Sequence, residues 1–107
     1  MYKRVEVLTK EGWRGPIGAL KRGLGAPATR FRLYALWGDQ LQGCESFGKE
    51  VRCSSLFAWT EIGWARYGEE TFKTCQDEFG TENVRVTAMT GQPVYSDEYQ
   101  VALPLVA

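Results

Sequence analysis

The chain has 107 residues, a net charge of zero and no histidine. Its length suits one domain with a single core, and a hydrophobic share of 44% with a charged share of 24% argues against a disordered chain. The lack of histidine excludes Ser-His-Asp and Cys-His catalytic pairs and histidine-bound metals. We therefore expect residues 1–107 to form one domain that binds a partner without catalysis, and that needs no cofactor and no metal.

The N-terminal residues lack the apolar stretch of a signal peptide, and residues 101–107 are too few to span a membrane. The three cysteines, Cys44, Cys53 and Cys75, are odd in number and lack the close pairs of a zinc site. We therefore expect a cytoplasmic protein with reduced, buried cysteines and no membrane partner. Nothing in the sequence indicates an oligomeric state.

The first third of the chain predicts one strand and a long loop. Residues 2–9 alternate loosely between apolar and charged side chains, which favours a strand. Residues 12–27 contain five glycines and two prolines, and these residue types count against a regular element over most of the stretch. We expect a loop there, with one helical turn at most, at residues 17–22.

Residues 30–37 alternate more strictly and predict a second strand, with Phe31, Leu33, Ala35 and Trp37 on one face. The Gly38-Asp39 pair that follows is typical of a two-residue hairpin turn. We therefore expect a return strand at residues 40–47, which would place Glu45 opposite Arg32. Residues 50–53 favour a short further strand.

The second half predicts a helical segment between strands. Residues 56–67 favour a helix capped by Ser54 or Ser55, although Gly63 weakens it. Residues 69–79 favour a better helix, with Phe72, Cys75 and Phe79 on one face and Gly80 at its end. Residues 84–89 and 99–106 alternate as two more strands.

This order of elements predicts an α+β domain. We expect a mostly antiparallel sheet of four or five strands, with one helical segment packed on one face. That segment is either one kinked helix or two helices.

Charge is distributed unevenly, with +6 over residues 1–34 and −5 over residues 54–107. Either the two segments neutralise each other in the fold, or residues 1–34 present a basic surface to a partner. No acid occurs between residues 12 and 32, and the stretch matches neither the P-loop nor the dinucleotide-binding pattern. Its basic residues suit phosphates or an acidic protein face, unless the loop is only a solvated surface. They are Arg14, Lys21, Arg22, Arg30 and Arg32.

Aromatic residues give a second candidate surface, formed by Trp13, Trp59, Trp64 and Tyr67. On one helix, Trp59 and Trp64 would lie about 140° apart, so both could not face the core. Exposed tryptophan and tyrosine are favoured as interface anchors. We therefore expect these four residues to bind a partner, unless the tryptophans pack under loops instead.

A small domain without catalytic residues acts by occupying a surface. We expect a steric inhibitor or assembly factor of the phage or mobile-element kind, with a protein or a protein–nucleic-acid complex as its partner. The alternative is a nucleic-acid-binding protein that uses the basic, glycine-rich N-terminal third. An enzyme with two carboxylates in a cleft is the least favoured reading, because so short a chain leaves little room for a cleft.

Overall fold

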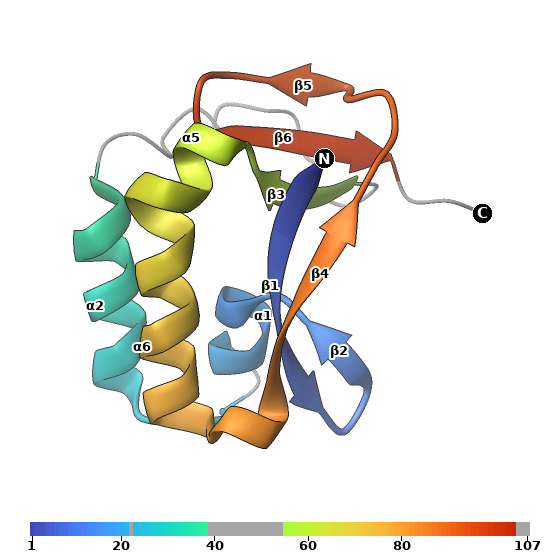
Figure 1. Cartoon of the computed structure of the whole chain (residues 1–107). Coiled ribbons are helices and arrows are strands. Elements are labelled where there is room, and N and C mark those ends of the chain that lie inside the picture. Colours follow the sequence, from blue (N-terminus) through green and yellow to red (C-terminus); the bar gives the residue numbers. More distant parts are fainter. Residues whose placement is uncertain (22, 39–54, 105–107) are drawn as a thin grey trace.

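The computed structural model describes residues 1–21, 23–38 and 55–104. Its strands form one antiparallel sheet of six (Figure 1). The strands are β1 (Tyr2–Thr9), β2 (Gly12–Arg14), β3 (Ser55–Trp59), β4 (Val84–Met89), β5 (Tyr95–Ser96) and β6 (Gln100–Pro104). Their order in the sheet is β2-β1-β3-β6-β5, and β4 pairs with β1. The α+β class and the antiparallel sheet are confirmed, and β2, β3 and β5 are strands that the sequence did not predict.

The first strand has neighbours on both edges. β4 pairs with β1 along residues 2–7 and so covers one edge. β2 pairs with residues 7–9 and β3 with Lys3, so both lie on the other edge. Between them, residues 4–6 of β1 have no strand neighbour on that edge among the described residues. The sheet is therefore split at this point.

Helical segments occupy much of the remaining described chain. They are α1 (Pro16–Lys21), α2 (Pro27–Trp37), α5 (Glu61–Gly63), a π-helical turn (Trp64–Gly68), α6 (Glu69–Phe79) and a 3₁₀ turn (Thr81–Asn83). Residues 61–79 are helical without a break, which confirms the expected helical segment from residue 61 onward. It begins at Thr60, whose hydroxyl accepts the Gly63 N–H at 3.0 Å, and ends at Gly80, which has a φ of 92°.

The main core lies between the strand pair of β1 and β4 and the helices, which cover one side of this pair (Figure 1). Its buried members are Val5, Val7, Ala19, Leu33, Cys75 and Val84. Phe72 and Phe79 are half-buried and pack against this cluster. The predicted apolar face of α6 therefore does point into the core, with Cys75 as its fully buried member.

The predicted strand at residues 30–37 is wrong, because these residues belong to α2. Pro27 stands in the first turn, where its fixed φ and missing N–H suit a helix start. Gly38, with a φ of 55°, ends the helix by donating its N–H to the Tyr34 carbonyl. A glycine at positive φ serves a helix end as well as a hairpin turn. The expected return strand at residues 40–47, its Arg32–Glu45 pair and the short strand at residues 50–53 lie outside the described residues.

Two further predictions need correction. The predicted helix at residues 56–67 starts too early, because Ser55–Trp59 forms β3 and pairs with β6 along its whole length. The predicted loop at residues 12–27 holds two regular elements. Gly12, with a φ of 101°, closes the tight turn from β1 into β2, and residues 16–21 form α1, as the expected helical turn suggested.

Candidate functional site

The four aromatic residues predicted to bind a partner do not gather on the surface. Trp59 is 9% exposed and Tyr67 is 7% exposed. Trp13 is half-buried, with the Arg85 guanidinium 4.1 Å from its ring centroid. Trp64 is also half-buried, and Lys3 lies 5.0 Å above it at the edge of a cavity of about 550 Å³. Because Trp59 lies on a strand and Trp64 on the π-helical turn, the premise that they share one helix is wrong.

Two of these residues belong instead to a chain of ring contacts inside the protein. Trp37, Trp59, Tyr67 and Tyr99 follow one another with centroid distances of 6.3, 6.0 and 5.3 Å. The Trp37 indole donates to the Thr71 hydroxyl at 2.9 Å, and this hydroxyl donates to the Tyr67 carbonyl at 2.8 Å. These contacts fix the positions of α2 and α6 against β3.

The predicted basic residues lie on three regular elements. Arg14 belongs to β2, Lys21 ends α1, and Arg30 and Arg32 belong to α2. Arg22 lies outside the described residues. In the described ranges, Lys21, Arg30 and Arg32 form no ion pair with an acid. None of the three therefore pairs directly with an acid of the described residues 55–104.

The outward face of α2 combines this charge with apolar side chains. Phe31 is 72% exposed, and Ala28 and Ala35 beside it on the helix are exposed too. Spacings of three and four residues place the three in one stripe. Arg30 and Arg32 flank the stripe, and α2 contains no acid. We call Ala28, Arg30, Phe31, Arg32 and Ala35 the outer face of α2.

An ion cluster lies on β1 near the split in the sheet. Glu6 accepts hydrogen bonds from Arg4 at 3.1 Å, from Arg85 at 3.0 Å and from Thr87 at 2.8 Å. Burial raises the pKa of the Glu6 carboxyl, but the three donors outweigh it and leave that pKa below its usual value. Arg4 also donates to the Phe57 carbonyl at 2.9 Å. Two cations thus share one carboxylate, and the cluster keeps a positive charge.

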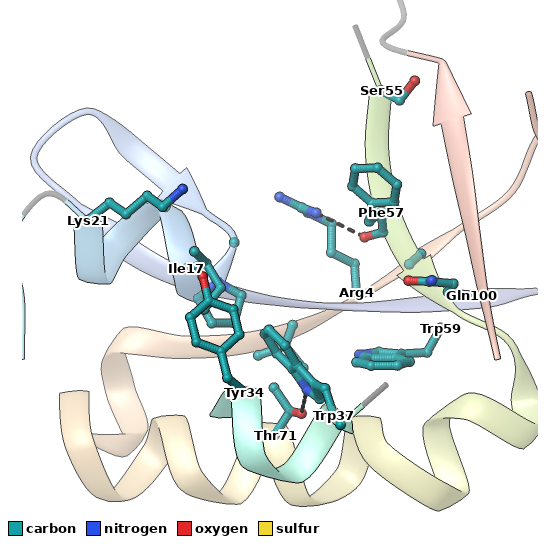
Figure 2. A pocket seen from close by; sticks show the side chains of 16 residues that line it. Arg4, Ile17, Lys21, Tyr34, Trp37, Ser55, Phe57, Trp59, Thr71 and Gln100 are labelled. Atoms are coloured by element: carbon teal, nitrogen blue, oxygen red, sulfur yellow. Dashed lines mark hydrogen bonds between the residues drawn. The ribbon is translucent and has the colours of Figure 1, made fainter. Parts of the chain in front are cut away.

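A cavity of about 520 Å³ lies at the split, between α1, α2 and β3 (Figure 2). Four aromatic residues, Tyr34, Trp37, Phe57 and Trp59, form much of its wall. Sequence reasoning missed this site because α2, β1 and β3 come together only through long-range packing. No spacing in the sequence brings Tyr34 and Phe57 to one place.

The carboxylate and thiol groups of the described residues bear on metal binding and on nucleophilic chemistry. No group of three or more Cys, Asp or Glu side chains in these ranges could hold a metal ion. Burial, and then the nearby Glu78 carboxylate, raise the pKa of the Cys75 thiol to about 12, so this thiol is a poor nucleophile. Cys44 and Cys53 lie outside the described residues.

Comparisons with protein-family models, with curated proteins and with solved structures find no match to this chain. No helix in the described ranges is both long and apolar enough to cross a membrane.

Proposed function

We infer that the protein is a non-catalytic binding protein that occupies a surface of a macromolecular partner through the outer face of α2. The observation that carries this proposal is Phe31, a large apolar side chain left 72% exposed in the centre of that face. An exposed aromatic ring on a regular helix is a suitable anchor, because it buries much area at a small entropic cost.

The flanking charges indicate the chemistry of the partner. Arg30 and Arg32 have no acidic neighbour on α2, and arginine is enriched at protein interfaces. We therefore expect a protein with an apolar hollow bordered by carboxylates. A domain of this size would act by steric occupation, as an inhibitor or assembly factor does. A phage or mobile-element setting belongs to the same proposal and is suggested by small size and the lack of catalytic motifs, and a cytoplasmic location is suggested by the odd number of cysteines.

Site-specific crosslinking tests the surface directly. A photoreactive phenylalanine analogue placed at Phe31 should crosslink one partner protein in cells that carry the gene. The matched control places the analogue at Ile62, which is apolar and 55% exposed on α5. Phe31→Ala should abolish co-purification of that partner, and Ile62→Ala should leave it unchanged. Equal crosslinking from both positions, or an unchanged yield with Phe31→Ala, would remove α2 from the interface.

Nucleic acid is the second candidate, because Lys21, Arg30 and Arg32 form no ion pair in the described ranges and Phe31 could stack on a base. A titration with a fluorescent single-stranded oligonucleotide at two salt concentrations separates the two cases. Phosphate contacts give an affinity that falls steeply with salt. Steep dependence, removed by Arg30→Glu together with Arg32→Glu, would favour nucleic acid; no measurable binding at low salt would exclude it.

A further inference from the structure

The 520 Å³ cavity has the size of a small-molecule site and the wall of one. Ligand pockets commonly measure about 300–1,000 Å³ and combine apolar, often aromatic walls with a few placed polar groups. Here the rings of Trp37 and Trp59 come from α2 and β3 and lie 6.3 Å apart between centroids. The hydrogen bond from the Trp37 indole to Thr71 keeps the first ring in place, so this wall exists before any ligand arrives.

The charged groups in the described lining of the cavity are all basic. Its described lining contains Arg4 and Lys21 and no Asp or Glu. Figure 2 shows the amino group of Lys21 and the guanidinium of Arg4 pointing toward the same space, from α1 and β1. Lys21 has no acidic partner in the described ranges. An anion placed between the two would therefore meet Lys21, which has no acidic partner there, and Arg4, which shares the Glu6 carboxylate with Arg85.

Arg4 is held ready for such a contact. Its side chain is 13% exposed, its Nε donates to Glu6 and its Nη1 to the Phe57 carbonyl. Its Nη2 has no hydrogen-bond partner among the described residues, and a Cβ on Gly15 would lie only 3.3 Å from this atom. Glycine at position 15 thus lets this end of the guanidinium lie close to the backbone without a clash, and the N–H groups of Nη2 keep their capacity to donate to an anion.

We propose that this cavity binds a small molecule made of a planar apolar body and one anionic group, a carboxylate or a phosphate. The aromatic wall covers the body, and Arg4 and Lys21 bind the anion. This site is separate from the outer face of α2, because Phe31 does not line the cavity.

Naphthoate, naphthyl phosphate and the neutral naphthalenemethanol are the probes for this proposal, with indole N–H signals of the intact protein followed by NMR. Naphthoate or naphthyl phosphate should shift the signals of Trp37 and Trp59 and leave that of Trp13 in place, since Trp13 lies outside the cavity. The neutral probe should bind about tenfold more weakly, the effect of losing one charge-assisted contact. The anion that binds more tightly identifies the preferred group.

Two pairs of variants separate the contribution of the basic groups to binding from that of the aromatic wall. Lys21→Gln should weaken the anionic probes by about three- to tenfold without affecting naphthalenemethanol, and Lys10→Gln, at an exposed lysine outside the cavity, should change neither. Tyr34→Ala should weaken all three probes, while Phe31→Ala on the same helix should weaken none. The proposal is overturned by absence of binding at millimolar probe, by equal affinity for naphthoate and naphthalenemethanol, or by shifts at Trp13. A failure of Phe31 crosslinking would leave these results unchanged.

Discussion

Replacing Leu33 by alanine should cost about 3 kcal/mol of unfolding free energy, and replacing Phe31 should cost almost nothing. Leu33 is 0% exposed and packs in the main core, and Leu→Ala at such sites costs about 2–5 kcal/mol. Phe31 is 72% exposed, so truncation removes little buried surface. Alanine also has a helix propensity better than phenylalanine by roughly 0.5 kcal/mol. The two terms leave Phe31→Ala within about 0.5 kcal/mol of the parent protein.

Urea denaturation followed by far-UV circular dichroism and tryptophan fluorescence measures both values, with equal slopes m as the control for a two-state transition. The comparison is sharp because residues two apart share a face in a strand but not in a helix. A strand at this place would bury both side chains together. If Phe31→Ala costs 2 kcal/mol or more, or if Leu33→Ala costs less than 1 kcal/mol, α2 is not packed as described.

Three other perturbations have defined outcomes. Gly63→Ala should cost about 2–3 kcal/mol in the same denaturation assay, because the new Cβ would overlap the Tyr99 carbonyl oxygen and the chain must shift to admit it; a neutral effect would contradict that close approach. For Glu6 and Asp97, burial raises the carboxyl pKa, but hydrogen bonds outweigh burial and leave both pKa values below normal. The two carboxylates therefore contribute their full stability above the unfolded pKa of about 4. They lose it as pH falls through the lower pKa values of the folded state. The melting temperature should fall below about pH 4, with a smaller fall in Glu6→Gln. Cys75 should resist iodoacetamide at about pH 8 in the folded protein and react in urea, since its thiol is fully buried with a pKa of about 12; peptide-level mass spectrometry that finds it alkylated without urea would show that the core opens.

Sequence reasoning found the elements whose pattern is local. Residues 2–9, 69–79 and 84–89 were predicted with the bounds that the structure has. In α6 the apolar residues recur at helical spacing, and in β4 they alternate. The end of α6 at Gly80 followed from the preference of glycine for positive φ.

The errors arose where tertiary packing decides the outcome. The sequence of α2 alternates like a strand only because Phe31 and Ala35 are apolar and exposed, while Leu33 is buried. The residues of β3 suit either a helix or a strand, and pairing with β6 selects the strand over the predicted helix. The outer face of α2 could not be predicted from the sequence, because Phe31 is exposed there only when α2 is a helix.

The central place of β1 has a consequence for how the chain acquires its structure. The C-terminal end of β1 pairs with β2, which follows it by only a few residues. Glu6 and Arg85, which pair across β1 and β4, are 79 positions apart. Closing so long a loop costs entropy before any contact is gained, and such pairings slow folding. On the ribosome, one edge of β1 must therefore wait unpaired until β4 has been synthesised. Throughout that interval Val5 and Val7, which later form the centre of the core, remain open to association with other chains.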